Sequence, residues 1–345
     1  MGNREKLNSR ETGMRFEGNP DVLVNLFRKQ ALLDAGDPRH TEIRTGLYVG
    51  SGGMKGVVGG GQVTALEKAG LKNVFDVAYG SSTGANAIAY FLAGQAELGT
   101  SIYYEECTSS QFLSFGRALR REKAMRIQSY LMPLFTHSAK KLNTEAIRRS
   151  RTDFRILVTD PQNAESTALD GRKVSDIVAA LGASSAAPGV SDGPVLVDGR
   201  LYQDGGATPS PIADMIREHH PTDMLIFPNC PEHISFGSRL PYTLLDAHFL
   251  SGFPTSVQKR FAKKEREKIF QEDLTFLRMQ KECRYLIIWP NSRIHSSTQN
   301  APRLYAAAQG ATKHLTGLLA EAKRYSGTGK NLSFLLNHHA VKFIE

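Results

Sequence analysis

The sequence predicts an α/β fold whose central sheet is mainly parallel, and two kinds of observation lead to this prediction. From Thr45 onward, short apolar runs suited to buried strands alternate with segments of helical periodicity. Two of the runs pass through small-residue turns directly into a helix, at 50–56 and 80–84. Strands that alternate with helices in this way build parallel sheets whose faces are covered by the helices.

The elements follow in order after a polar lead-in, residues 1–40, which holds one helical stretch near 20–33. A predicted catalytic domain spans 41–240, and a mostly helical C-terminal extension spans 241–345. Because the boundary near residue 240 is soft, the second region can also belong to the same compact body. The apolar runs predict strands at 46–50, 74–79, 154–158, 224–227 and 284–289, and the periodic segments predict helices at 61–69, 85–92, 174–181, 211–218 and 301–322.

Composition narrows the class of protein. Of 345 residues, 41% are hydrophobic and 22% charged, which is ordinary for a globular chain. The three cysteines, Cys107, Cys230 and Cys283, show no CxxC spacing, which argues against a disulfide framework or a structural zinc site. The N-terminus lacks an apolar signal core, and no stretch approaches the roughly 18 apolar residues of a membrane span. We therefore expect a cytoplasmic protein, at most peripheral at a membrane.

A candidate nucleophile lies in the second small-residue turn. Gly80-Ser81-Ser82-Thr83-Gly84 fits the pattern G-x-S-x-G, with an apolar strand before it and a small-residue helix after it. Such a turn holds the Ser82 hydroxyl clear of the backbone at the start of a helix. Gly80 and Gly84 allow neighbouring elements to approach where a Cβ would clash. A glycine-rich turn with an incidental serine is the structural alternative.

The first glycine loop follows the first strand and can direct several backbone N–H groups at one anionic oxygen. A phosphate site and an oxyanion hole for acyl transfer both use such a loop. The dinucleotide pattern fits poorly, because Ser51 takes its first glycine place and no acid ends the second strand. Lys55 either contributes charge near an oxyanion or forms a surface ion pair. The loop reads Gly50-Ser51-Gly52-Gly53-Met54-Lys55-Gly56.

A serine nucleophile needs a proton acceptor, and Asp204 is the strongest candidate. It ends a predicted strand and is followed by Gly205 and Gly206, whereas Asp198-Gly199 reads as the tip of a tight hairpin. Asp170-Gly171 and Asp192-Gly193 read as ordinary turns. A histidine that completes a triad stays possible at this stage, and the histidines that follow Asp204 in chain order are His219, His220, His233 and His248.

Taken together, four motifs over roughly residues 45–230 resemble the patatin-like phospholipase family: the glycine loop, the serine turn, Ala183–Gly189 (ASSAAPG) and Asp204-Gly205-Gly206. The resemblance implies a three-layer α/β fold that hydrolyses acyl esters of phospholipids, lysophospholipids or neutral lipids, without metal or other cofactor. Ser51 departs from the family pattern, which usually has glycine there. The region after residue 240 is similar to C-terminal extensions of some bacterial members.

The same resemblance implies the roles of individual residues. Ser82 would be the nucleophile and Asp204 the general base of a Ser–Asp dyad without histidine, and the amides of Gly52, Gly53 and Met54 would form the oxyanion hole. A transacylase would use the same residues but pass the acyl group to a lipid or an alcohol. An inactive lipid-binding module is a further alternative, disfavoured by the intact serine, base and loop.

The formal net charge of +9 favours anionic partners, and the basic residues cluster in two segments, 117–126 and 259–268. We expect these segments to be either solvated helix faces or patches that dock on anionic membrane. Phe112, Phe115, Leu119 and Phe261 would then add shallow apolar contacts. No zinc-finger spacing or RNA-recognition signature occurs, so a nucleic-acid partner is not expected.

Overall fold

The computed structural model describes residues 15–114, 116–117, 120, 122–230, 250–290 and 294–327. These residues form one mixed sheet with the strand order β1-β9-β8-β2-β3-β4-β7-β6, and β5 pairs with β4 outside this path. The five strands from β9 to β4 run parallel, and the pairs that involve β1, β5, β6 and β7 are antiparallel. The strands are β1 (Arg15–Gly18), β2 (Thr45–Val49), β3 (Val77–Ser81), β4 (Asp153–Thr159), β5 (Ser166–Asp170), β6 (Val195–Val197), β7 (Arg200–Asp204), β8 (Asp223–Phe227) and β9 (Arg284–Trp289).

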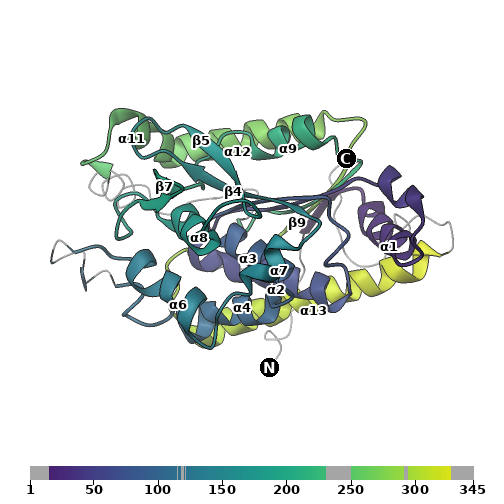
Figure 1. The fold of residues 1–345 in the computed structure, drawn as a ribbon, viewed down its shortest axis with the longest axis horizontal. Coiled ribbons are helices and arrows are strands. Elements are labelled where there is room, and N and C mark those ends of the chain that lie inside the picture. Colours follow the sequence, from purple (N-terminus) through teal and green to yellow (C-terminus); the bar gives the residue numbers. More distant parts are fainter. Residues whose placement is uncertain are drawn as a thin grey trace, which may run out of the picture.

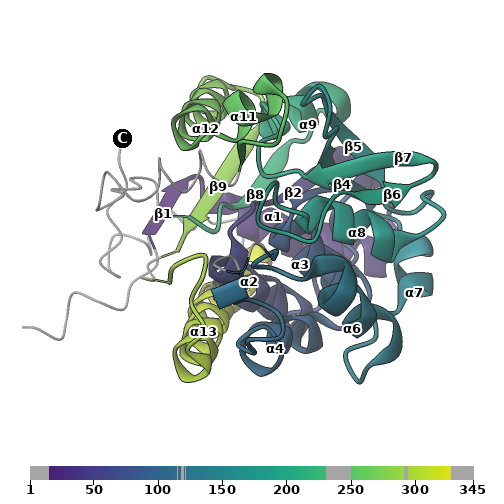
Figure 2. The same cartoon turned by 90° about the vertical axis from the view of Figure 1, so that its left-hand side faces the viewer.

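Helices cover both faces of the sheet, so the chain has the three-layer α/β architecture that the family resemblance implied (Figures 1 and 2). One layer contains α9 (Pro211–His219), α11 (Thr255–Phe261) and α12 (Lys263–Arg278). The opposite layer contains α1 (Asp21–Asp34), α2 (Val57–Lys68), α3 (Thr83–Leu92), α4 (Ala96–Glu105), α6 (Met132–His137), α7 (Thr144–Arg148), α8 (Ile177–Ser185) and α13 (Ala301–Ser326). Short turns of helix, η1 (Pro38–Glu42), η2 (Gly53–Gly56) and η3 (Ile127–Leu131), complete the elements.

Each face of the sheet has its own apolar core, because strand side chains alternate between the two faces. On β2, Leu47 and Val49 belong to the large core beneath α2, α3 and α13, whereas Tyr48 belongs to the smaller core beneath α9 and α12. Trp289 of β9 joins that smaller core, where its ring meets Phe270 of α12 edge-on. The sheet is thus buried on both sides, as is usual for a parallel sheet.

The described part of the region after residue 240, residues 250–290 and 294–327, is packed into this same body. Strand β9 pairs in parallel with β8, and α13 lies along α2 (Figure 1). The Thr312 hydroxyl of α13 donates to the carbonyl of Gly61 in α2, at 2.9 Å. A Cβ on Gly61 would come within 2.5 Å of the Ala308 carbonyl oxygen. Glycine at 61 therefore allows the two helices to approach closely.

Candidate active site

Ser82 lies at the sharp turn between β3 and α3, where G-x-S-x-G predicted it. Its backbone adopts φ 53° and ψ −123°, a conformation that L residues rarely take and that stores of the order of 1–3 kcal/mol. The Ser82 carbonyl accepts a bond from the Asn86 amide, so the strained residue leads directly into the first turn of α3. The dipole of this helix directs partial positive charge toward the serine.

The serine turn needs glycine at positions 80 and 84, because neighbouring backbone atoms leave no room for a Cβ. A Cβ on Gly84 would lie 2.0 Å from the Val49 carbonyl oxygen at the end of β2, and one on Gly80 would lie 2.6 Å from Cα of Ala85. Both distances are shorter than any real Cβ contact. Larger residues would push α3 away from the sheet and would therefore move the serine.

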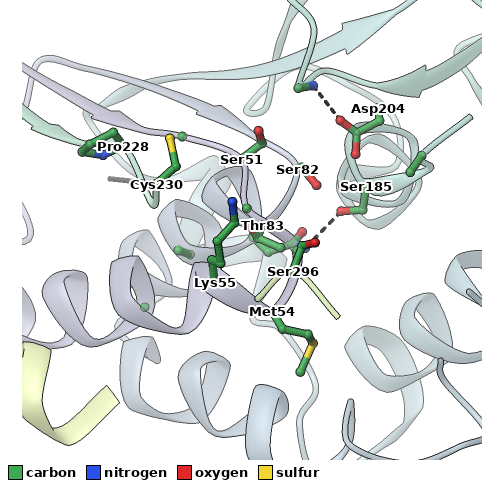
Figure 3. A pocket seen from close by; sticks show the side chains of 18 of the residues that line it. Ser51, Met54, Lys55, Ser82, Thr83, Ser185, Asp204, Pro228, Cys230 and Ser296 are labelled. Carbon is green, nitrogen blue, oxygen red and sulfur yellow. Dashed lines mark hydrogen bonds between the residues drawn. The ribbon is translucent and has the colours of Figure 1, made fainter. Parts of the chain in front are cut away.

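Strand β4 brings Asp204 next to Ser82. Ser81 pairs with Leu157 of β4 on one side, and Asp204 pairs with Val158 on the other. The serine turn and the aspartate thus lie on opposite sides of β4 at neighbouring positions along it, and each strand is about 5 Å from β4. Figure 3 shows the Ser82 hydroxyl and the Asp204 carboxylate pointing toward one another.

The surroundings of Asp204 suit a base. The residue is only 9% exposed, and burial raises the pKa of its carboxyl group to about 6. Hydrogen bonds from the Gly206 amide, at 2.6 Å, and from the Ser82 side chain oppose this rise, as does the charge of Arg266. Such a carboxylate is ionised at neutral pH and still a stronger base than an ordinary aspartate.

Ser184, in the middle of the ASSAAPG motif, joins the serine turn to the aspartate loop. Its hydroxyl accepts the Ser82 amide at 2.8 Å and donates to the Leu157 carbonyl at 2.7 Å. Its own carbonyl accepts the Gly205 amide at 3.3 Å. Gly205 is needed there, since a Cβ would lie 2.0 Å from the Leu157 carbonyl oxygen. The motif is recognisable in the sequence, but this role of Ser184 was not predicted from it.

The glycine loop lies beside the serine turn, as predicted, but one expected donor is occupied. The Met54 amide donates to the carbonyl of Ser296, at 3.0 Å. It is therefore not available to an oxyanion, contrary to the prediction. The amides of Gly52 and Gly53 have no acceptor among the described residues. Gly53 has φ +55°, and a Cβ there would lie 2.8 Å from the Ser296 carbonyl oxygen. The backbone amide of Thr83, which follows the serine, is a further donor of the kind such turns supply.

Lys55 and Gly56 complete the loop. Lys55 lines the same cavity as Ser82, and burial lowers the pKa of its ammonium group. No carboxylate of the described residues forms an ion pair with it, so the predicted alternative of a surface ion pair is not seen there. Gly56 packs against the serine turn, where a Cβ would lie 2.5 Å from Oγ1 of Thr83.

Asn229, just after β8, holds the loop in place and was not predicted. Its side-chain amide donates to the Gly50 carbonyl at 2.6 Å, and its Oδ1 accepts the Gly59 amide at 2.9 Å. One buried side chain thus joins the start of the loop to the first turn of α2. An asparagine just after a strand is the sequence signal that could have indicated it, because asparagine adopts positive φ more readily than most residues, as Asn229 does with φ 56°.

Ser82 and Asp204 line a cavity of about 980 Å³. Ser51, Lys55 and Gly206 line it as well (Figure 3). Apolar side chains form much of the rest of its lining, among them Ile102, Phe112, Leu131, Phe135 and Val190. Helix α12 closes another side with Arg266, Phe270 and Asp273. A polar reacting corner joined to an apolar space is the arrangement expected for an amphiphilic substrate.

No histidine of the described residues lines this cavity. His219 lies at the C-terminal end of α9, where its ring meets the Tyr79 ring edge-on. Its Nδ1 is 4.0 Å from Oδ2 of Asp153. His220 follows it at the helix C-cap. His233 and His248 lie outside the described residues. The Asp198-Gly199 hairpin tip is present between β6 and β7, and Asp170 accepts the Arg172 amide in a local turn, as predicted.

Asp192 does more than an ordinary turn residue. Its carboxylate accepts the amides of Ile127, Gln128 and Ser129 at 2.8 to 3.0 Å. It therefore holds the start of η3, a segment that lines the cavity with Ile127 and Leu131. No local pattern predicts this contact, because the residues it joins are more than 60 positions apart.

The first basic segment differs in part from the expectation of solvated or membrane-facing charge. Arg117 is buried and donates to the carbonyls of Ser110, Phe112, Lys123 and Ala124, so it organises a loop rather than a surface. The expected membrane contacts Phe112 and Phe261 are buried, at 5% and 7% exposure, and both line the cavity. Phe115 and Leu119 lie outside the described residues. In the second segment Lys259 is exposed.

The described residues contain no group of three or more histidine, cysteine or acidic side chains that could hold a metal ion. Cys107, Cys230 and Cys283 are free thiols. Among the helices that the structure describes, none has both the length and the hydropathy needed to cross a bilayer.

Comparison with known proteins agrees with the geometry of the site. A family model described as patatin-like phospholipase matches residues 47–225, more than half of the chain. The chain belongs to the patatin-like phospholipase family. It is thus a lipid acyl hydrolase by family. A comparison with curated proteins finds no match.

Three solved structures resemble the chain remotely. VipD from Legionella pneumophila shares 11% identity over 81% of this chain and 67% of that chain, with a TM-score of 0.39. The type III effector protein ExoU shares 13% identity over 81% and 53%, with a TM-score of 0.34. Human GIVD cytosolic phospholipase A2, in complex with a fluorophosphonate inhibitor, shares 13% over 90% and 64%, with a TM-score of 0.38. The family assignment therefore rests on the family model and not on these structures.

Proposed function

We propose that this patatin-like protein hydrolyses carboxylic esters of phospholipids or lysophospholipids through a dyad of Ser82 and Asp204. The observation that carries the proposal is the approach of a strained serine to a buried carboxylate in one largely apolar cavity. The pKa of about 6 leaves that carboxylate ionised at neutral pH, ready to accept a proton.

The first half of the reaction forms an acyl-enzyme. Asp204 takes the proton of the Ser82 hydroxyl while Oγ attacks the ester carbonyl carbon, and the carbonyl oxygen becomes an oxyanion. The alcohol then leaves as the carbonyl re-forms, and it takes the proton from Asp204. The acyl group remains on Ser82.

The second half of the reaction hydrolyses the acyl-enzyme and regenerates the free enzyme. Asp204 takes a proton from water, the resulting hydroxide attacks the acyl carbon, and Ser82 leaves with the proton from Asp204. The free amides of Gly52 and Gly53, with that of Thr83, would hold the oxyanion in both halves. Met54 is left out of this set because its amide is bonded to Ser296.

Contact with anionic membrane is part of the proposal, now limited to the second basic segment. Lys259 is exposed on α11, which packs beside the aspartate loop through Phe261 and Ala207. Clustered cations near an anionic surface contribute about 1 kcal/mol each, and salt weakens this attraction. The segment 259–268 would thus hold the cavity close to its lipid.

The experiment that tests the function compares the wild type with Ser82→Ala. We expect a fluorophosphonate probe to label the wild type alone, and incubation with a membrane extract to release fatty acid with the wild type alone. Added glycerol distinguishes hydrolysis from transacylation, because a transacylase would form new acylglycerol. Labelling that persists on Ser82→Ala would refute Ser82 as nucleophile, and labelling without any turnover would favour a lipid-binding module.

A further inference from the structure

One wall of the cavity is a single face of α3. The residues of this helix that line the cavity are Thr83, Asn86, Ala87 and Tyr90, which have the 3–4-residue spacing of one helix face. The cavity therefore runs along α3, starting at Ser82 and continuing for two turns. Tyr90 is eight residues beyond Ser82, which corresponds to about 12 Å along a helix.

The walls around this part of the cavity are apolar and well packed. Ile102 of α4, Leu131 of η3 and Phe135 of α6 line it, and each is no more than 6% exposed. Near the serine end of the arm, the side-chain NH2 group of Asn86 donates to the Ser185 hydroxyl, at 3.1 Å, whereas its Oδ1 is buried and has no hydrogen-bond partner among the described residues. Along the walls formed by Ile102, Leu131 and Phe135 a hydrocarbon chain meets apolar side chains, and its burial there is favourable.

The far end is closed by two aromatic rings. Tyr90 and Phe135 meet edge-on, with centroids 5.6 Å apart and an interplanar angle of 76°. The Tyr90 hydroxyl donates to the carbonyl of Lys140, which fixes the ring and turns its polar end away from the cavity. Gly99 of α4 fixes the ring from another side, since a Cβ there would lie 2.3 Å from Cγ of Tyr90. The end wall is therefore rigid.

We propose that this arm of the cavity holds the acyl chain of the ester and that the Tyr90–Phe135 pair limits its length. The inference rests on the proposed function, because it takes Ser82 as the point where the acyl carbonyl sits. A straight chain advances roughly 1.25 Å per carbon, from C–C bonds of about 1.5 Å at tetrahedral angles. The distance from Ser82 to Tyr90 thus accommodates about ten carbons, and longer chains must bend or leave carbons in water.

The test measures kcat/KM for p-nitrophenyl esters of increasing chain length. Each methylene that enters an apolar pocket is worth about fourfold. We expect the wild-type values to rise with length until about ten carbons and then to level off or fall. Phe135→Ala opens the end wall, so we expect the optimum to move by about two to four carbons toward longer chains. Ala87→Leu fills the middle of the arm and should move it toward shorter chains.

A matched control separates the wall from general loosening of the protein. Phe75 is also fully buried, also meets a residue of α3 edge-on (Phe91, at 6.1 Å), and does not line the cavity. Phe75→Ala removes the same side chain from a similar packing site, so it should leave the chain-length profile unchanged. A profile that moves equally in Phe75→Ala and Phe135→Ala would overturn the proposal.

A second measurement does not depend on turnover. Saturated fatty acids of increasing length are titrated calorimetrically into Ser82→Ala, with and without Phe135→Ala. We expect the affinity gain per carbon to stop at the same length as in the kinetics and to continue further when Phe135 is replaced. Identical length profiles with and without Phe135 would refute the wall even if hydrolysis is established. A shifted binding profile without any wild-type hydrolysis would support the wall and refute the proposed function.

Discussion

Burial of Asp204 gives a prediction about stability as well as about catalysis. The folded state holds the pKa of this carboxyl at about 6, whereas its ordinary value is 3.8. Between these two values the unfolded chain loses the proton and the folded chain keeps it. Stability contributed by this group is therefore present at low pH and is lost as the pH rises through about 6. The wild type thus carries a buried charge at neutral pH that it would be more stable without.

The magnitude follows from the two pKa values. Their difference corresponds to about 3 kcal/mol of unfolding free energy, lost between acid and neutral pH. Asp204→Asn cannot titrate, so it lacks this loss. We expect the free energy of unfolding of Asp204→Asn, relative to that of the wild type, to become about 2.4 kcal/mol more favourable between about pH 4 and about pH 7.5, because the remainder of the loss falls below pH 4.

The assay is urea unfolding of both proteins across this pH range, together with the pH dependence of wild-type kcat/KM. Because Asp204 must be ionised to act as base, the rate should fall about tenfold per pH unit below about pH 6. At neutral pH, Asp204→Asn should lower the acylation rate by at least about 10²-fold, and substitutions of His219 or His220 should be far milder. Parallel stability curves for the wild type and Asp204→Asn would refute the assigned burial and pKa.

Asp273 supplies a matched control. It is also buried, at 1% exposure, and also has a pKa raised to about 6 by burial, but it accepts the amides of Ile212 and Ala213 instead of facing the serine. Asp273→Asn should change the pH dependence of stability in the same sense and leave the acid limb of kcat/KM in place. If the acid limb disappeared in Asp273→Asn, the titration that controls kcat/KM would belong to Asp273 and not to Asp204.

Two further predictions concern Ser184 and the basic segment. Ser184→Ala leaves the buried Ser82 amide and Leu157 carbonyl without partners, so we expect it to lower the free energy of unfolding by about 2–4 kcal/mol and kcat by up to about 10²-fold. Ser185→Ala, its neighbour, loses one bond to Asn86 and should cost no more than about 1.5 kcal/mol, so equal losses in the two variants would contradict the linking role of Ser184. Replacing Lys259, Arg260, Lys263 and Lys264 by Gln should weaken co-sedimentation with anionic vesicles at low salt more than at high salt, with little change on soluble esters. Equal binding of wild type and variant would leave the segment as solvated charge.

Local signals in the sequence predicted the parallel part of the sheet, whereas the pairing of Ser82 with Asp204 was implied by the resemblance to a known family. The alternation of apolar runs with periodic segments predicted strands and helices that the structure contains, including β9 and α13. Parallel strands present their C-terminal turns at one edge, which placed the serine turn next to the glycine loop. The glycines at 80, 84 and 205 were also singled out from the sequence, and the structure shows why glycine is needed there: a Cβ at each position would meet a backbone atom.

Contacts that depend on the register of distant segments could not be predicted. The occupied amide of Met54 depends on the Ser296 carbonyl, more than 200 residues away, and no pattern near Met54 indicates it. Arg117 looked like one member of a basic run, but its guanidinium satisfies carbonyls that only the folded loop brings together. Phe112 and Phe261 were placed at the surface because sequence periodicity does not reveal a cavity. The antiparallel strand β1 was missed in the polar lead-in, because four residues carry too weak a pattern.

The region beyond the family match contributes to the site as well as to the sheet. The match ends at residue 225, yet the glycine loop is held by Asn229 and by the carbonyl of Ser296, and α9 is held by Asp273. Each of these groups satisfies a backbone polar group that would otherwise be buried and unpaired, at about 1–3 kcal/mol apiece. The strained serine and the buried carboxylate both lower stability, and these long-range bonds oppose that loss. The C-terminal strand and helices are thus part of what keeps the nucleophile, the loop and the base in one arrangement.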